Sequence, residues 1–438
     1  MRFNPFQPNK IVNSAMFVGR LDEIKKIEHY LFQARSGNAQ NFLIDGERGI
    51  GKSSLLHFVS TIANGRIVGV SGVRFNFLLL SIDMGGVTAQ LDIVRAIARE
   101  LKSALARIQD LKENAKKVID FMANWEVMGV RYHKERDTID PEDAKDALVD
   151  QIVRVAQDDS LGFEGVLIVI DEADAPPIEA GFGEFLKSVT ERLTRRDCEN
   201  VLFGLAGLPS TIGKLRASHE SAPRIFTILH LEPLEAVECI SAINIGMRVA
   251  NDKNERSTSL TDEALTLLAD LSEGYPHFIQ QFSYSAFEAD DNSVIDEADV
   301  LNGAYGENGA IHQLGRKYFS EAYFSKINSD DYRKLLDVMA DHGDDWVNRR
   351  QLIFESKLKE GTVNNALAAL KQKTIIIADE SRQGFYRLPT RSFAAWINAL
   401  KSATERRALG HTPQLPLGSD PLMDELVASA PTGTSPKS

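Results

Sequence analysis

The chain has 438 residues, of which 43% are hydrophobic and 26% are charged, and its formal net charge is −12 at pH 7. This length and composition predict a soluble, globular protein of two or three domains. The negative charge opposes indiscriminate binding to phosphate backbones, so any contact with nucleic acid has to come from a local basic patch.

The two cysteines, Cys198 and Cys239, provide neither a disulfide framework nor metal-ligand spacing. No run of about eighteen or more apolar residues occurs, and the first ten residues are too polar for a signal peptide. We therefore expect a cytoplasmic protein that does not associate with membranes.

A glycine-rich loop stands between an apolar, strand-like run at 41–45 and a helix-like run at 54–64. Its pattern, Gly-x4-Gly-Lys-Ser from Gly46 to Ser53, is typical of a phosphate-binding loop, in which backbone N–H groups and the helix dipole hold phosphate oxygens. Lys52 is expected to reach the β- and γ-phosphates of ATP, and Ser53 to bind Mg²⁺. The expected nucleotide contacts are Gly46, Gly49, Ile50, Gly51, Lys52, Ser53 and Ser54. A glycine-rich turn that matched by chance would lack this strand and helix.

Strands and helices alternate after the loop. Strands are predicted at 75–84, 165–170, 200–206 and 225–231, and helices at 91–106, 141–157 and 182–195. Asp140 is expected to cap the helix at 141–157, and the charged residues 109–137 are interpreted as an insertion. Five buried strands separated by helices predict an α/β fold whose parallel sheet binds ligands at the carboxyl ends of its strands.

Two further modules are predicted in the second half of the chain. Helices dominate from 234 to about 304 with an interruption at Gly274-Tyr-Pro276, which indicates a helical lid. Three helices at 332–342, 349–359 and 362–372 precede two short strands at 374–378 and 384–388, and this order is typical of a winged helix-turn-helix. The predicted domains are a phosphate-loop core at 1–233, a lid at 234–325, a winged helix-turn-helix at 326–401 and a disordered tail at 402–438.

Two adjacent carboxylates close the apolar strand at 165–170. In phosphate-loop proteins the first of such a pair holds Mg²⁺, and this role falls to Asp171. Glu172 is placed to polarise the attacking water, which favours hydrolysis of ATP over its storage. As an alternative the pair merely ends the strand, but the upstream phosphate loop argues against this. The sequence therefore predicts a Mg²⁺-dependent ATPase.

The residues before the phosphate loop carry a family resemblance. Phe17-Val-Gly-Arg20 followed by Leu21-Asp-Glu-Ile24 resembles the entry motif of AAA+ ATPases of the origin-recognition and STAND-like branches, and Asn4-Pro-Phe-Gln-Pro8 is similar to the leader of bacterial and archaeal relatives. The resemblance covers about residues 4–283. It implies an AAA+ type sheet and places Phe17, Val18 and Gly19 at the adenine or ribose, although this motif alone would be only a short strand and turn.

The same resemblance implies an oligomer. Arg224 resembles the arginine finger that one subunit offers to the γ-phosphate of its neighbour, which implies a catalytic role at the interface of a homo-oligomer. Arg216 is a rival finger, and a surface salt bridge is the alternative for Arg224. A polar sensor is expected near Ala206-Gly207, but the first polar side chains there are Ser210 and Thr211.

The lid motif Gly274-Tyr-Pro-His-Phe278 resembles the Gly-x-Pro of STAND-like ATPases, and no arginine follows up to Asp290 to act as a second sensor. This absence favours a slow switch over rapid turnover. For His277 a phosphate contact is one alternative, and a position near solvent at a helix start is the expectation.

Residues 346–391 reverse the charge of the chain, with nine Lys or Arg against four acids, a net +5. If this module binds double-stranded DNA, Thr362, Asn364 and Asn365 would lie near base edges, and Arg382 and Arg387 would contact the backbone or minor groove. Winged helices also serve as protein-interaction or autoinhibitory modules, so protein partners are the alternative.

Three functions follow from these features. The first is an AAA+ ATPase whose nucleotide state controls assembly and DNA engagement. The second is a STAND-like signalling or defence scaffold in which ATP drives oligomerisation and protein partners are the targets. The third is a nucleotide-binding protein with negligible hydrolysis. DNA stimulation of ATP turnover separates the first two.

Overall fold

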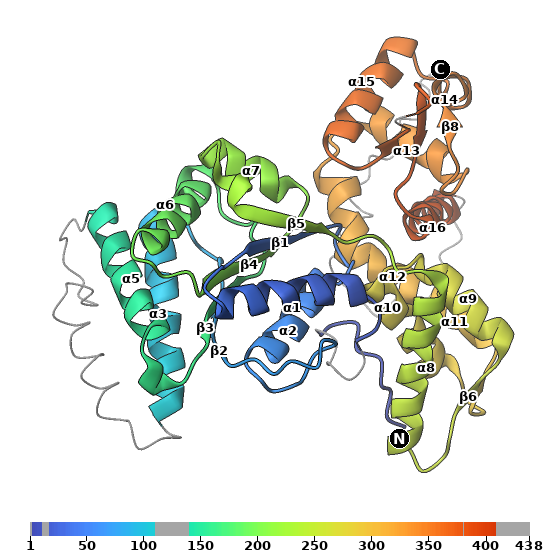
Figure 1. Cartoon of the computed structure of the whole chain (residues 1–438). Helices are drawn as coiled ribbons and strands as arrows, with labels where there is room; N and C mark the ends of the chain where they lie inside the picture. Colours follow the sequence, from blue (N-terminus) through green and yellow to red (C-terminus); the bar gives the residue numbers. More distant parts are fainter. Residues whose placement is uncertain (1, 11–16, 110–139, 380, 409–438) are drawn as a thin grey trace. The chain divides into compact units, whose positions relative to one another are not determined.

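The computed structural model describes residues 2–10, 17–109, 140–379 and 381–408 (Figure 1). All but the first residue of the predicted insertion at 109–137 lies outside this part of the chain, as does the tail from 409 onward. The chain divides into two compact units, Asn9–Leu234 and Glu235–Ser438, and the leader Met1–Pro8 belongs to the second. Among the described helices, none is long and apolar enough to span a membrane.

The first unit is built on a parallel sheet. Its strands are β1 (Asn41–Asp45), β2 (Phe77–Ile82), β3 (Gly165–Ile170), β4 (Val201–Gly207) and β5 (Phe226–His230). All neighbours pair in parallel in the order β2-β3-β4-β1-β5. This confirms the predicted five-stranded sheet, and it brings the carboxyl ends of all five strands to one edge.

Helices cover the sheet on two sides. They are α1 (Leu21–Arg35), α2 (Lys52–Ala63), α3 (Gln90–Gln109), α5 (Pro141–Ala156), α6 (Phe182–Thr194) and α7 (Ser210–Ser218), with the 3₁₀ turns η2 (Asp159–Leu161), η3 (Ile178–Ala180) and η4 (Ala222–Ile225). The cap predicted for α5 is confirmed, since the Asp140 carboxylate accepts the N–H of Glu142 at 2.9 Å.

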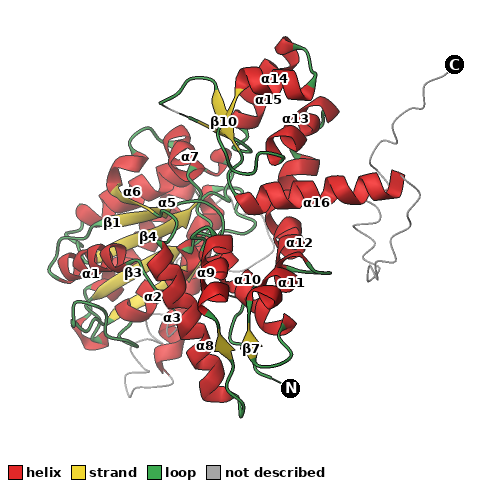
Figure 2. Ribbon diagram, turned by 90° about the vertical axis from the view of Figure 1, so that its right-hand side faces the viewer, coloured by secondary structure: helices red, strands yellow, loops and turns green. Residues whose placement is uncertain are grey.

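The alternating direction of side chains along the strands explains why helices cover both faces of the sheet. Successive side chains of a strand point to opposite faces, so residues such as Leu80, Ile168 and Phe203 share one face. These three lie in a buried cluster with the apolar sides of α3, α5 and α6. Helix α2 packs along β1 to β4, and α1 packs on α2 (Figures 1 and 2).

The second unit begins with helices. They are α8 (Ala236–Lys253), α9 (Asp262–Ser272), α10 (Pro276–Ala289), α11 (Glu297–Tyr305) and α12 (Ala310–Leu314), the last continued by the π-helical segments η5 (Gly315–Phe319) and η6 (Glu321–Ser325). The short strands β6 (Ser259–Leu260) and β7 (Val294–Ile295) pair in parallel. The helices up to about residue 304 were predicted, whereas the helical stretch 310–325 was not.

The leader is anchored to the helices of this unit. Phe6 is only 2% exposed, and its ring lies 2.3 Å from where a Cβ on Gly246 would be. Because glycine leaves room on α8, the aromatic side chain of the leader can sit directly against the helix backbone.

The C-terminal module, residues 330–408, combines helices with a small sheet. Its elements are α13 (Asp330–Ala340), β8 (Val347–Asn348), α14 (Arg349–Ser356), α15 (Glu360–Gln372), β9 (Ile377–Ala378), β10 (Phe385–Arg387) and α16 (Arg391–Ala408). The sheet is antiparallel in the order β8-β10-β9. The first three helices and the β9–β10 hairpin follow the predicted pattern. Helix α16 was not predicted, and it runs past residue 402, where the tail was expected to begin (Figure 2).

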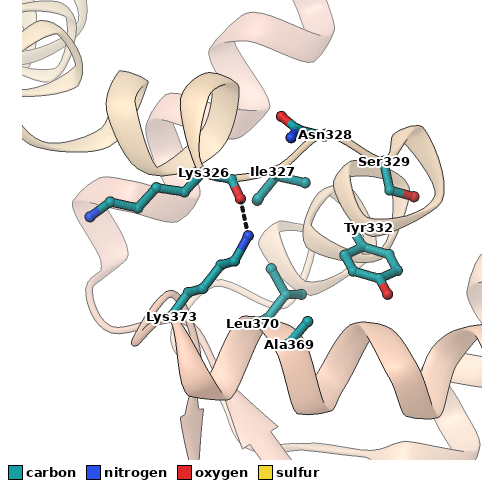
Figure 3. A pocket seen from close by; sticks show the side chains of 8 residues that line it. All are labelled: Lys326, Ile327, Asn328, Ser329, Tyr332, Ala369, Leu370 and Lys373. Carbon is teal, nitrogen blue, oxygen red and sulfur yellow. Dashed lines mark hydrogen bonds between the residues drawn. The ribbon is translucent and has the colours of Figure 1, made fainter.

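A cavity of about 280 Å³ lies in the second unit between the residues before α13 and the end of α15 (Figure 3). It is lined by Lys326, Ile327, Asn328, Ser329, Tyr332, Ala369, Leu370 and Lys373. The Lys373 ammonium donates to the carbonyl of Lys326 across the cavity. This bond attaches the end of α15 to the chain that enters the module.

Candidate nucleotide site

The loop after β1 depends on its glycines. Gly46, Gly49 and Gly51 have φ angles of 155°, 82° and 98°, which side chains rarely adopt. A Cβ on Gly46 would also meet the side chain of Ile50 at 3.0 Å and the carbonyl of Leu231 at 3.1 Å. The backbone therefore requires glycine at these positions, as the motif predicted.

Helix α2 begins at the end of this loop. Gly51 occupies its N-cap position, and no side chain caps the helix. The N–H groups of a first turn have no partner inside their helix, and the helix dipole places partial positive charge there. Ser53 and Ser54 lie in this turn. The loop and helix start thus form a cradle of donors suited to phosphate.

Lys52, at the end of the phosphate loop, lies in the electrostatic field of three carboxylates. Its ammonium donates to the carbonyls of Gly46 and Glu47, each at 2.8 Å. Burial lowers the pKa of Lys52, while Asp174, Glu47 and Asp171 act in the opposite direction. Since Asp171 takes part in this field, the predicted metal ligand and the loop lysine belong to one site. A phosphate group would add further negative charge beside the ammonium.

The end of β3 has a strained backbone at the predicted catalytic residue. Glu172 has φ of 50°, is exposed, and donates its N–H to the Asp171 carboxylate at 2.9 Å. The next residue, Ala173, donates its N–H to the carbonyl of Ala206 at the end of β4, at 2.8 Å. A left-handed backbone at a residue other than glycine persists only where its surroundings fix it, and such residues cluster at functional sites.

The entry motif is attached to the phosphate loop. The ring of Phe17 stacks on Phe58 of α2, with centroids 4.7 Å apart and an interplanar angle of 9°. Arg20 is buried, and its guanidinium donates to the carbonyl of Ile50 at 3.2 Å. Phe17, Val18 and Gly19, predicted to wall the base, are all partly buried. The contact from Arg20 was not predicted, because it joins residues thirty positions apart and no local pattern reveals it.

A third acid, Asp174, also acts on Lys52 and was not predicted. Its carboxylate accepts the N–H of Leu208, just after β4, at 2.9 Å. Lys214 of α7 donates to the carbonyls of Asp174 and Pro176. The available signal was the spacing Asp-Glu-x-Asp, which carries three carboxylates past the end of a buried strand.

The predicted fingers lie on the surface of the first unit. Arg224 is exposed in η4, directly before β5, and Arg216 is exposed near the end of α7. Exposure is what a finger for a neighbouring subunit requires, and it is also ordinary for arginine.

The prediction that His277 lies near solvent is wrong. Its side chain is half-buried on α10, edge-on to the ring of Tyr318 with centroids 5.0 Å apart, and its Nε2 is buried with no hydrogen-bond partner among the described residues. Burial, followed by the nearby charge of Lys317, lowers the pKa of His277 to about 4. The imidazole is therefore neutral near pH 7 and carries no charge toward a phosphate.

The parallel sheet, the glycine-rich loop after β1 and the helix α2 that follows it define a phosphate-loop fold. Residues 16–202 match the AAA ATPase domain family, and the chain carries such a domain.

Known proteins resemble larger parts of the chain. An uncharacterized HTH-type transcriptional regulator of Methanocaldococcus jannaschii is 26% identical over 291 residues, which span 64% of this chain and 65% of that protein. The ORC2 protein of Aeropyrum pernix, solved as ADPNP and ADP complexes, is 15% identical, with a TM-score of 0.54 over 92% of this chain and 98% of that one. A Walker-type ATPase of Pyrococcus abyssi is 16% identical, with a TM-score of 0.51 over 87% and 96%. At these identities the two structures show a shared fold.

Proposed function

We propose that this protein hydrolyses ATP with Mg²⁺ and that its nucleotide state controls assembly and engagement of double-stranded DNA. The observation that carries the proposal is the position of Lys52, which lies under a glycine loop at a helix start and within the field of Asp171 and Asp174. Phosphate, a hard cation and an attacking water all have suitable groups there.

The residues present fit both ligands. A Cβ on Gly46 would meet the Ile50 side chain and the Leu231 carbonyl, and Gly49 and Gly51 have φ angles that favour glycine. The Ser53 hydroxyl and the Asp171 carboxylate are hard oxygen donors of the kind that Mg²⁺ takes together with phosphate oxygens. Bound Mg²⁺ would supply positive charge to the β- and γ-phosphate oxygens.

In the proposed reaction Glu172 acts as the general base. It orients a water whose oxygen attacks the γ-phosphorus, and it accepts the proton that this water loses. The bond from the γ-phosphorus to the β,γ-bridging oxygen breaks, giving ADP and inorganic phosphate. Lys52 remains protonated in this role and holds the negative charge of the phosphates. Burial lowers the pKa of Lys52 overall, and the carboxylates of Asp174, Glu47 and Asp171 oppose this effect.

Arg224 is the residue by which we propose that ATP is linked to assembly of the oligomer. The residue is exposed in η4 at the surface of the first unit. A guanidinium offered to the γ-phosphate of a neighbouring subunit would make hydrolysis depend on a homo-oligomer and would link assembly to ATP.

DNA engagement would use the C-terminal module as a winged helix. Asn364 and Asn365 are exposed on α15, and Arg349 donates to the Asn364 amide oxygen at 2.7 Å. In the β9–β10 hairpin, Arg382 lies 4.8 Å from the ring centroid of Phe385. The similarity to a regulator of the HTH type supports DNA as the partner.

A protein partner is the second candidate, and the ion pairs of the module favour it. Arg382 pairs with Asp379 at 2.6 Å, and Arg349 pairs with Glu360 at 3.1 Å. These pairs neutralise part of the charge that a phosphate backbone would attract. A STAND-like switch would use the same ATP site and present this module to a protein.

The test is steady-state ATP hydrolysis of the full chain with and without double-stranded DNA at low salt, with Glu172→Gln as the blank. A rate that requires Glu172 and rises with DNA supports the leading proposal. A Glu172-dependent rate indifferent to DNA favours the protein partner. A rate no higher than the blank refutes hydrolysis at this site.

A further inference from the structure

The Asp174 carboxylate acts electrostatically on Lys52 and binds the turn that follows β4. Among the carboxylates that act on Lys52 it has the largest effect, so it lies within the field of the phosphate loop. Its Oδ1 also accepts the N–H of Leu208 at 2.9 Å, just beyond the end of β4. One side chain therefore connects the phosphate site to the turn that follows the neighbouring strand.

The turn after β4 is packed directly against this carboxylate. A Cβ on Gly207 would meet the Thr211 hydroxyl at 2.3 Å and the Asp174 Oδ1 at 3.2 Å. Thr211 is fully buried, and its hydroxyl has no hydrogen-bond partner in the described part of the chain. From the other side, Lys214 binds the carbonyls of Asp174 and Pro176. Residues 171–176 and 207–214 thus form one connected group.

Glu172 stands in the middle of this group with a strained backbone. Its φ of 50° is held between the Glu172 N–H bond to Asp171 and the Ala173 N–H bond to Ala206. The bond from Leu208 to Asp174 continues this attachment of the β3 end to the β4 end. Strain of this kind relaxes when the surrounding bonds are removed, and the side chain then loses its fixed direction.

We propose that Asp174 is a positioning residue for ATP hydrolysis, which holds the 207–211 turn against the end of β3 and thereby keeps Glu172 aimed at the phosphate loop. The inference rests on the proposed function and deepens it. Asp174 acts through the Leu208 bond, so an uncharged oxygen acceptor at the same place keeps most of the effect.

The test compares Asp174→Ala and Asp174→Asn with Asp83→Asn. Alanine removes the acceptor, whereas asparagine keeps an oxygen for the Leu208 N–H and removes only the charge. Asp83 is a matched control because it follows β2 at the same edge of the sheet and its carboxylate accepts the N–H of Gly85 at 2.7 Å. We expect kcat to fall about tenfold or more in Asp174→Ala, with KM for ATP changed less than about threefold. Asp174→Asn should keep at least about threefold more kcat than Asp174→Ala, and the Asp83 control should stay within about threefold of the wild-type kcat.

Hydrogen exchange of peptides spanning 204–212, read by mass spectrometry without nucleotide, adds a readout that does not depend on catalysis. Exchange should accelerate in Asp174→Ala alone, while peptides of α6 stay protected in every variant, which shows that the fold is intact. Wild-type kcat in Asp174→Ala, an equal loss in the Asn and Ala variants, or unchanged exchange would overturn the inference. A wild type whose hydrolysis matches Glu172→Gln would instead overturn the proposed function, and this inference with it.

Discussion

Arg20 offers the sharpest test of how the entry motif supports the phosphate loop. The Arg20→Met change keeps a long apolar stem in a buried position and removes the guanidinium that donates to Ile50. The backbone at residue 20 has φ of 62°, which methionine tolerates no better and no worse than arginine. The variant removes this donor together with the 4.0 Å ion pair between Arg20 and Glu23.

The expected size follows from the bond that is lost. A hydrogen bond to a charged group contributes about 1.5–3 kcal/mol net, and a buried carbonyl left without a donor costs a similar amount. The Ile50 carbonyl lies between Gly49 and Gly51, both in left-handed conformations, so the loss falls on the part of the loop that forms the cradle. With about 1.4 kcal/mol for each factor of ten, ATP binding should weaken by roughly 10- to 100-fold.

The assay is titration of a fluorescent ATP analogue, with urea unfolding of the same samples. Arg35→Met is the control, because Arg35 ends the same helix and pairs at the surface with Glu164 at 3.4 Å; its affinity should be unchanged. Wild-type affinity in Arg20→Met would refute the argument that this arginine holds the loop. A loss confined to unfolding free energy, with normal affinity in the folded protein, would refute it equally.

Three further predictions concern the site and the second unit. Lys52→Ala should abolish ATP binding in the same titration, because the phosphates lose their main cation, while Lys187→Ala on the surface of α6 should bind normally; retained affinity in Lys52→Ala would remove the phosphate-loop assignment. Arg224→Ala should lower hydrolysis and regain it when mixed with Glu172→Gln, since each subunit then supplies what its neighbour lacks, and absence of complementation at every ratio would argue against a shared site. For His277, the folded-state pKa of about 4 lies below the ordinary value near 6.5. Its contribution to stability is therefore complete above pH 6.5 and is lost as the pH falls toward 4. Urea unfolding should show about 2 kcal/mol less stability at pH 5 than at pH 7 from this group, a difference that His277→Leu removes; an unchanged pH dependence in that variant would contradict the burial argument.

The sequence by itself determined the parts of the protein whose physics is local. Glycines at 46, 49 and 51 were predicted from spacing and are required by the φ angles they adopt. Buried parallel strands have apolar side chains on both faces, so their runs stand out in the sequence, and Asp171 and Glu172 were placed by the end of such a run. The Asp140 cap was predictable for the same reason, since a cap and its helix are neighbours in the chain.

Tertiary structure alone decided the contacts between distant segments. The residues around Arg20 in the sequence do not indicate its hydrogen bond to Ile50, and those around Asp174 do not indicate its bond to Leu208. Each of these bonds joins two segments that meet only when the sheet has formed. His277 looked like a polar helix start, yet the unpredicted π-helical segment η5 brings Tyr318 over it and buries it. Helix α16 was not predicted because the residue that caps its start is distant in the sequence. The Glu273 carboxylate accepts the N–H groups of Arg391 and Ser392 at 2.8 and 2.9 Å. Local patterns report the groups a segment contains, whereas packing between segments decides which of those groups meet.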